Sequence, residues 1–262
     1  MTLDPGALLE TALAAAEDAA TLVMRGYRSR PTVGKKGRID LVTEFDRASE
    51  TLLRERLTRD TPFAFHGEET GAVGTGDVVW YVDPLDGTTN FVHGHPFFCV
   101  SVGLFAEGEP VLGAIVAPAL GVTWTGLATG GAWRNGVPCA VSDEASLDDA
   151  LLATGFPYDR ATSPDNNLAE FVALKLRGHG VRRCGAAAVD LCLVADGTYD
   201  GYWERKLNPW DFCAGAAIVL GAGGRLSALD GGPADVRSGN LVATNGHVHD
   251  ALVHALVNAP RL

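Results

Sequence analysis

The segment from Val78 to Phe91, VVWYVDPLDGTTNF, constrains the fold more than any other part of the chain. Its first five residues are apolar, β-branched or aromatic, a composition that predicts a short buried strand. The strand is expected to end at Asp83, because Pro84 has no backbone N–H to donate to a neighbouring strand. Two carboxylates, Asp83 and Asp86, then follow three residues apart.

These two carboxylates are expected to point into one small volume. Without a cation between them, their repulsion would raise the pKa of one strongly, and a hard divalent metal is the simplest remedy. Gly87 and the next three residues, Thr88 to Asn90, add a permissive backbone and free N–H groups at a predicted helix start. Such an arrangement holds phosphate oxygens.

Two other interpretations compete for the same segment. Asp, Pro and Gly are common turn residues, so Asp83–Gly87 is also typical of an ordinary turn. A calcium-binding structural module is less consistent, since an EF-hand needs oxygen ligands at alternate positions and Glu at the twelfth. Leu85 interrupts that alternation, and the twelfth residue from Asp83 is Gly94.

Length and composition predict one globular domain over residues 1–262. A chain of 262 residues at 47% hydrophobic content can bury a large core, as one domain or as two tightly apposed layers. The net charge of −11 argues against direct nucleic-acid or anionic-membrane binding, both of which need basic surfaces.

Cysteine usage and the N-terminus predict a cytoplasmic protein. The five cysteines are odd in number and form no CxxC pair, which indicates reduced thiols rather than a disulfide framework or zinc site. The first residues lack the basic and apolar regions of a secretory signal, and no apolar run reaches about 18 residues.

Further acidic candidates lie before the central segment. Thr43 is a good cap for a helix over residues 44–58, and Asp46 at its third position completes a capping box, which is the local interpretation of Asp46. Glu68 follows a predicted strand and precedes Glu69; such a pair is usually solvated, but Glu68 could face Asp83 as a third oxygen ligand. Residues 71–77 are expected to form a surface loop.

The rest of the chain alternates predicted strands and helices. Residues 97–105 and 111–117 predict a hairpin, and Ser163-Pro164-Asp165 predicts the start of a helix that runs to Arg177. Asp211 lies at another predicted helix start, where a carboxylate is favourable against the helix dipole. Gly34–Arg38 is a basic loop, typical of a solvated turn unless it folds toward a phosphate or metal. Since P-loop, serine-hydrolase and zincin motifs are absent, carboxylate chemistry remains.

Four segments in this order resemble the inositol monophosphatase family. They are Asp40-Leu41-Val42-Thr43 with Asp46, Gly67-Glu68-Glu69, Asp83 to Phe91, and Trp210-Asp211. The resemblance covers nearly the whole chain and implies an α+β fold built as an alternating α/β/α/β/α sandwich. It also implies a magnesium-dependent, lithium-sensitive phosphomonoesterase that forms homodimers.

The resemblance assigns metal ligands by motif position. Glu68, Asp83 and the backbone carbonyl of Leu85 would hold a first Mg²⁺, while Asp83, Asp86 and Asp211 would hold a second. The family uses two or three Mg²⁺ per site. Hard oxygen ligands suit magnesium, and a metal pair can clamp the attacking and leaving oxygens of an in-line displacement.

The resemblance also assigns catalytic and substrate-binding roles. Thr88 and Asp46, together with the ligand Glu68, would orient and polarise a metal-activated water. The backbone of Gly87 and Thr88 would hold phosphate. Asp86, Gly185, Ala187, Glu204 and Asp211 would also line the substrate site. Metal-binding layers over about 1–140 would thus precede substrate-lining layers over about 141–262.

The leading hypothesis is an inositol-1-monophosphatase-type phosphoric monoester hydrolase. Histidinol phosphate, fructose 1,6-bisphosphate and 3′-phosphoadenosine 5′-phosphate are rival substrates, because fold and metal motif do not select the alcohol. Glu204 could accept hydrogen bonds from ring hydroxyls, or could be an exposed acid at a strand end. A non-catalytic regulator of the transcription or ribosome-assembly machinery is a further alternative, against which the complete set of metal and nucleophile positions argues.

Overall fold

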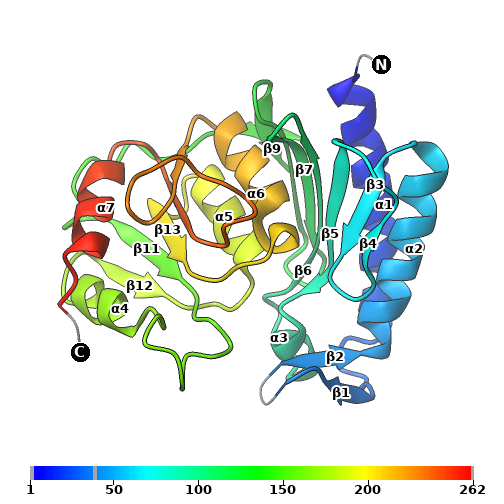
Figure 1. Ribbon diagram of the computed structural model, residues 1–262, viewed down its shortest axis with the longest axis horizontal. Helices are drawn as coiled ribbons and strands as arrows, with labels where there is room; N and C mark the ends of the chain where they lie inside the picture. Colours follow the sequence, from blue (N-terminus) through cyan, green and yellow to red (C-terminus); the bar gives the residue numbers. More distant parts are fainter. Residues whose placement is uncertain (1–2, 38–39, 261–262) are drawn as a thin grey trace.

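The computed structural model describes residues 3–37 and 40–260, and these fold into alternating layers of helices and sheets (Figure 1). Helices α1 and α2 cover one face of a large sheet, and α5 and α6 pack on its other face. A smaller sheet lies beyond α5, with α4 and α7 on its outer side. The predicted α/β/α/β/α sandwich is therefore confirmed.

The large sheet contains eight strands in the order β10-β9-β8-β7-β6-β5-β3-β4. All neighbours are antiparallel except the parallel pair β3 and β5. Its strands are β3 (Ala64–Gly67), β4 (Gly71–Val73), β5 (Val79–Asp86), β6 (Cys99–Ala106), β7 (Glu109–Ala117), β8 (Val122–Leu127), β9 (Gly131–Arg134) and β10 (Val137–Cys139).

The outer helices are α1 (Pro5–Met24) and α2 (Glu44–Asp60). One stripe of α1 is rich in buried alanine, which brings the helix backbone close to the sheet. The Thr43 side chain caps α2, and the Asp46 carboxylate receives the Thr43 backbone N–H at 2.8 Å, so the predicted capping box forms.

The central helices are α5 (Ala187–Ala195) and α6 (Pro209–Gly221), and small residues let α6 approach the large sheet. A Cβ atom added to Gly103 would lie 2.6 Å from the Ala214 backbone nitrogen, and one added to Gly113 would lie 2.2 Å from the Ala214 carbonyl oxygen. Close packing of this kind fixes the start of α6, and with it Asp211, relative to the end of β5.

The smaller sheet has the strand order β12-β11-β13-β15-β14. Its strands are β11 (Leu151–Thr154), β12 (Gly180–Arg182), β13 (Gly201–Glu204), β14 (Arg225–Ser227) and β15 (Leu241–Thr244). The remaining elements are the helices α3 (Thr88–Val92), α4 (Leu168–Lys175) and α7 (His249–Val257), and the antiparallel pair β1 (Val33–Lys35) and β2 (Leu41–Thr43). Among the described helices, none is long and apolar enough to cross a membrane.

Three predictions of local structure were wrong. Strand β5 continues past Pro84 to Asp86, because a bulge absorbs the proline. Residues 71–73 of the predicted loop pair with β3 as a strand. The helix predicted from Ser163 begins only at Leu168, since the preceding segment is held as a loop by Lys206, whose ammonium contacts Asp159 and Ser163 at 2.7 and 2.8 Å.

Candidate active site

A β-bulge at the end of β5 directs the two central carboxylates. Asp83 pairs with Ser101 of β6 and Asp86 with Cys99, so Pro84 and Leu85 lie opposite a single residue of β6 and form a bulge with one extra residue. The Leu85 backbone N–H donates to Asp83 Oδ1 at 3.0 Å, and the Ser49 hydroxyl donates to the Pro84 carbonyl at 2.9 Å. These bonds hold the bulge from both sides.

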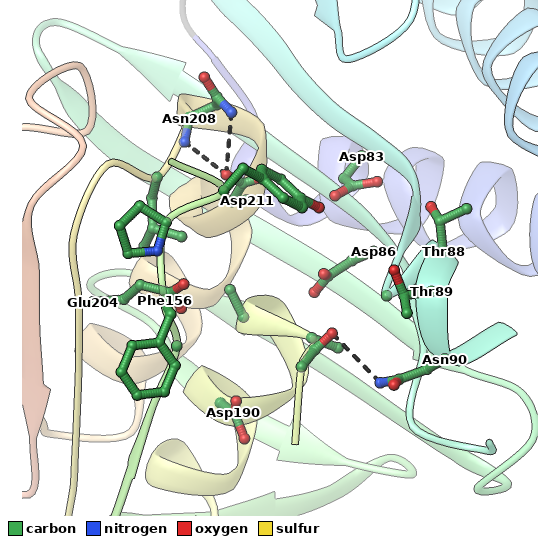
Figure 2. A pocket seen from close by; sticks show the side chains of 18 of the residues that line it. Asp83, Asp86, Thr88, Thr89, Asn90, Phe156, Asp190, Glu204, Asn208 and Asp211 are labelled. Atoms are coloured by element: carbon green, nitrogen blue, oxygen red, sulfur yellow. Dashed lines mark hydrogen bonds between the residues drawn. The ribbon is translucent and has the colours of Figure 1, made fainter. Parts of the chain in front are cut away.

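The carboxylates open into a pocket of about 510 Å³ between the large sheet and the loops of the smaller one (Figure 2). Asp83 and Thr88 lie on one side of this view, Glu204 lies on the other, and Asp86 lies between them. The predicted site residues among those that line the pocket are Glu68, Asp83, Leu85, Asp86, Gly87, Thr88, Gly185, Ala187, Glu204 and Asp211. The fold thus brings together residues from segments far apart in sequence.

The acidic groups of the pocket repel one another. Burial raises the pKa of Asp83 well above its usual value, and the charges of Glu68, Asp86 and Asp211 raise it further. Burial likewise raises the pKa of Asp86 to about 7 and the pKa of Asp211 well above its usual value. Carboxyl groups packed in this way favour a bound cation, which would neutralise them together.

Two of these carboxylates are oriented by backbone N–H groups. Asp86 Oδ2 accepts from the Ala188 N–H at 2.8 Å, at the start of α5, where no side chain caps the helix. Asp211 Oδ2 accepts from the Asn208 N–H at 2.6 Å at the start of α6. Asp211 therefore stabilises the start of α6, as its local sequence suggests, and it also lines the pocket.

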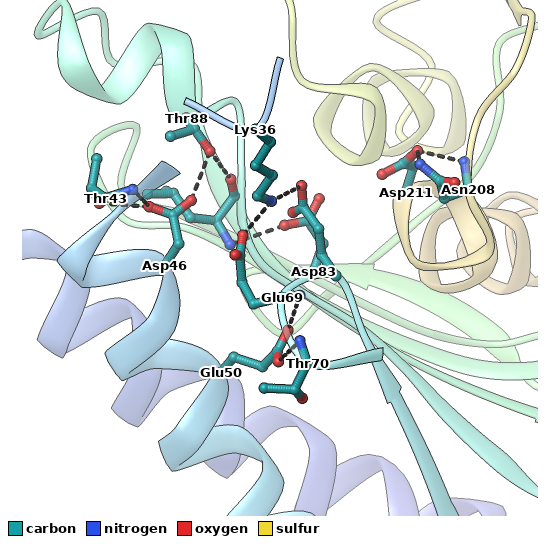
Figure 3. A network of polar contacts seen from close by, with 12 residues as sticks. Lys36, Thr43, Asp46, Glu50, Glu69, Thr70, Asp83, Thr88, Asn208 and Asp211 are labelled. Carbon is teal, nitrogen blue, oxygen red and sulfur yellow. Dashed lines mark hydrogen bonds and ion pairs between the residues drawn. The ribbon is translucent and has the colours of Figure 1, made fainter. Parts of the chain in front are cut away.

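A lysine already places a positive charge at the edge of this cluster. Lys36 Nζ lies 2.8 Å from Glu68 Oε1 and also contacts Glu69 (Figure 3). Burial disfavours the charged ammonium, but the two carboxylates raise the pKa of Lys36 above its usual value. In the described part of the chain no three or more His, Cys, Asp or Glu side chains lie close enough together to hold a metal ion as they are placed here. Hard oxygen donors that flank an open space nevertheless fit Mg²⁺, which retains several waters.

Thr88 and Asp46 form a hydrogen-bonded pair beside the bulge. The Thr88 hydroxyl lies 2.8 Å from Asp46 Oδ1 and 3.0 Å from the Leu85 carbonyl oxygen. Asp46 Oδ2 is occupied by the Thr43 backbone N–H at 2.8 Å and by the Thr43 hydroxyl at 2.5 Å. Asp46 therefore serves as a helix cap with one oxygen and reaches Thr88 with the other.

The helix start at α3 requires glycine. Gly87 has a φ of +88°, and a Cβ added there would lie 2.9 Å from the Phe97 carbonyl oxygen. The next three residues, Thr88 to Asn90, line the same pocket as Asp86. This is the permissive glycine and helix start that the sequence predicts.

On the opposite side, Glu204 is half-buried rather than an exposed strand-end acid. Its carboxylate accepts a short hydrogen bond from the Tyr202 hydroxyl, and burial raises the pKa of Glu204 to about 7. Gly155 packs directly against it, since a Cβ added to Gly155 would lie 2.0 Å from the carboxylate oxygens. Gly185 has a φ of +90°, and Ala187 opens α5 beside it.

Four residues that the sequence did not assign to the site contribute to it. Asn90 Nδ2 donates to the Phe97 and Cys184 carbonyls at 2.7 and 2.9 Å, which ties α3 to the Gly185 loop. Lys36 lies in the basic loop, and that loop does fold toward the acidic cluster; Arg38 of the same loop is outside the described residues. Glu50 has no sequence signal, because it matches the polar face of an ordinary helix, whereas Asp190 is the only charged residue of the apolar helix α5, a signal that could have found it.

Glu50 supports the loop that carries Glu68. Its two carboxylate oxygens accept the backbone N–H groups of Glu69 and Thr70, each at 2.7 Å (Figure 3). The contact requires Gly67, because a Cβ there would lie 2.4 Å from Glu50 Oε2. Glu50 is 1% exposed. A buried carboxylate thus holds the backbone next to the candidate ligand.

Comparison with known proteins identifies the family. The model of the inositol monophosphatase family matches residues 4–261. An inositol-1-monophosphatase of Synechocystis is 46% identical over 233 residues, 87% of this chain and 81% of its own. The Nus factor SuhB of Pseudomonas aeruginosa is 39% identical over 255 residues, 94% of each chain. The structure of an inositol monophosphatase from Anabaena shares 42% identity with a TM-score of 0.91, over 98% of both chains. The chain therefore belongs to the inositol monophosphatase family of phosphatases.

Proposed function

We propose that the protein hydrolyses myo-inositol 1-phosphate to inositol and phosphate in a Mg²⁺-dependent reaction. The observation that carries this proposal is the convergence of Asp83, Asp86, Asp211 and Glu68 on one pocket that also contains the start of α3. Acidic oxygens suit magnesium, and the helix start suits a phosphate group. The family, and relatives named inositol-1-monophosphatase, support the same reaction.

Magnesium would be held by the candidate ligands Glu68, Asp83, Asp86, Asp211 and the Leu85 carbonyl, as two or three ions. When bound, the metal lowers the pKa of water and neutralises charge on the phosphoryl group. It also reverses the local field, so that a chain of net charge −11 accepts an anion. Uncatalysed phosphate-monoester hydrolysis is slow enough that enzymes accelerate it by up to ~10²¹-fold, and one general base supplies only about 10²–10⁴.

The roles of the protein groups follow from their hydrogen bonds. The Thr88 hydroxyl donates a hydrogen bond to Asp46 Oδ1, which leaves the lone pairs of its oxygen to accept a hydrogen bond from the attacking water. Asp46 thereby orients the nucleophile through Thr88, while the backbone of Gly87 and Thr88 holds phosphate oxygens. Glu68 acts from the opposite side as a ligand and polarising group.

The alcohol of the substrate is expected to lie against Glu204, Gly185 and Ala187, which line the pocket; Glu204 lies on the side away from Asp83 (Figure 2). The fixed Glu204 carboxyl accepts a hydrogen bond from a ring hydroxyl. Histidinol phosphate, fructose 1,6-bisphosphate and 3′-phosphoadenosine 5′-phosphate remain the rival substrates, distinguished by their rates of phosphate release.

The decisive variant is Asp83→Asn, which preserves shape but removes the charge shared by both proposed metal positions. We expect phosphate release from inositol 1-phosphate with excess Mg²⁺ to fall at least 10³-fold in Asp83→Asn, a loss of the order found when one electrostatic group of an active site is removed. Circular dichroism should show an unchanged fold. Wild-type activity in this variant, or wild-type activity in the presence of a chelator, would rule out the metal assignment.

A second role is suggested by the relative named Nus factor SuhB. We propose as the alternative that the chain binds a component of the transcription or ribosome-assembly machinery without catalysis. The same Asp83→Asn variant separates the two, because a binding role does not require the charge of Asp83. The expected homodimer is tested by light scattering of the purified protein.

A further inference from the structure

One buried carboxyl group of the pocket has no partner. Asp190, in α5, is 1% exposed, and among the described residues no donor reaches its Oδ1 atom. The residue nevertheless lines the pocket of about 510 Å³. Burying a polar group without a hydrogen bond costs free energy, so such groups are rare in folded proteins and call for a physical explanation.

The neighbours of Asp190 do not satisfy it. The Tyr202 hydroxyl is engaged by Glu204, and the Cys184 thiol lies 3.6 Å from the Tyr199 hydroxyl. Burial, with the charges of Glu204 and Asp86, raises the pKa of Asp190 well above its usual value, and Arg183 only partly opposes the shift. The surrounding protein therefore stabilises neither form of the carboxyl fully.

The position of Asp190 indicates where its partner comes from. In Figure 2, Asp190 and Glu204 lie on the side of the pocket away from Asp83 and Thr88. Asp83 and the helix start at Thr88, which suits phosphate, are on the other side. A ligand with its phosphate at that end would present its alcohol to the two carboxyl groups.

We infer that Asp190 is a specificity-determining residue that hydrogen-bonds a hydroxyl group of the substrate alcohol. The inference rests on the proposed phosphatase function and adds a residue to the part of the site that selects the alcohol. A hydroxyl group can both donate and accept, so it matches a carboxyl in either protonation state. Together with Glu204, Asp190 would engage two hydroxyls of one alcohol.

Such a site favours an alcohol that has a hydroxyl group and also disfavours binding of an alcohol that lacks one. An alcohol without hydroxyls leaves the buried carboxyl unpaired, and enzymes that bind a substrate hydroxyl in a buried site discriminate strongly against analogues that lack it. Because the carboxyl has no partner in the free protein, removing it should weaken substrate binding without lowering the free energy of unfolding.

The test compares two substrates in wild type and Asp190→Asn with excess Mg²⁺. Inositol 1-phosphate carries ring hydroxyls, whereas the leaving group of 4-nitrophenyl phosphate has none to offer. We expect kcat/KM for inositol 1-phosphate to fall 10- to 100-fold, mainly through a higher KM, and kcat/KM for 4-nitrophenyl phosphate to stay within about threefold. The melting temperature should equal or exceed that of wild type. Asp190→Ala provides a second variant that removes the carboxyl entirely.

Asp196→Asn is the matched control at the C-terminal cap of the same helix. Its carboxyl is also buried but is already bonded by the Trp124 indole N–H at 3.0 Å, so this variant should lose stability and keep the ratio of the two substrates. A lowered melting temperature in Asp190→Asn with equal loss on both substrates would overturn the inference in favour of a structural role. Wild type that hydrolyses 4-nitrophenyl phosphate but not polyol phosphates would overturn it while the phosphatase function stands; wild type inactive on both would refute the proposed function itself.

Discussion

Replacement of Glu50 by Gln tests whether the backbone clamp under Glu68 sets the affinity for Mg²⁺. The two bonds from the Glu69 and Thr70 N–H groups are 2.7 Å long and reach a buried carboxylate. Hydrogen bonds to charged groups contribute about 1.5–3 kcal/mol each. Gln keeps one oxygen acceptor but presents an NH₂ group to the other N–H, so one of the two bonds is lost.

The loss is expected to appear in both metal binding and stability. One charged bond of about 1.5–3 kcal/mol corresponds to about 10- to 150-fold in an equilibrium constant if it acts on metal binding alone. Because the clamp is already formed in this structure, the loss is shared with folding. We therefore expect the Mg²⁺ concentration for half-maximal activity to rise about tenfold and kcat at saturating Mg²⁺ to stay within about threefold.

The assay is phosphate release as a function of Mg²⁺ concentration, accompanied by thermal unfolding. Glu55→Gln, an exposed position on the same helix, is the matched control and should leave both curves unchanged. A half-saturating Mg²⁺ concentration within twofold of wild type would refute the positioning role of Glu50. A loss of kcat that excess Mg²⁺ does not restore would also refute this positioning role.

Three further predictions concern the site and the core. Thr88→Val keeps the shape but removes the hydroxyl between Asp46 and the water, so kcat should fall about 10²–10⁴-fold at saturating Mg²⁺, measured by phosphate release; a smaller change would contradict the role of Thr88. Mg²⁺ at about 100 times its dissociation constant should raise the melting temperature by roughly 5–10 °C over a chelated sample, and Asp83→Asn should abolish that shift. Burial lowers the pKa of His249 to about 4, below the unfolded value of about 6.5, so its contribution is complete above pH 6.5 and declines as pH falls to about 4. The melting temperature of wild type should therefore drop more over this range than that of His249→Asn, and parallel curves would show that His249 carries no such contribution.

Local sequence was sufficient for much of the candidate site. The Asp83–Gly87 segment after an apolar run, the Thr43 cap with Asp46, and Asp211 at a helix start all formed as expected. In each case the determining contacts join residues within a few positions of one another. Hydrophobic periodicity and capping act at that range, so they can be read without knowledge of the fold.

Local rules failed where a distant segment supplied a stronger interaction. The proline that should have ended β5 is held in a bulge by Ser49, which is 35 positions away in sequence. The helix expected at Ser163 yields to a loop because Lys206 binds Asp159 and Arg205 binds Asp165. The helix that does form begins at Leu168, directly after Asn167, whose buried amide bonds Thr154 and the Gly155 carbonyl.

The sequence by itself determined the chemistry: which carboxylates, hydroxyl and glycine are available, and on which local elements they lie. Only the tertiary structure decided how they are arranged. It brought Ala188 to Asp86 across 102 positions and Lys36 to Glu68 across 32, and among the described residues it left Asp190 Oδ1 buried without a hydrogen-bond partner. The physical reason is that local hydrogen bonds form within one turn or strand, whereas the pairing and burial of charges depend on which layers pack against each other.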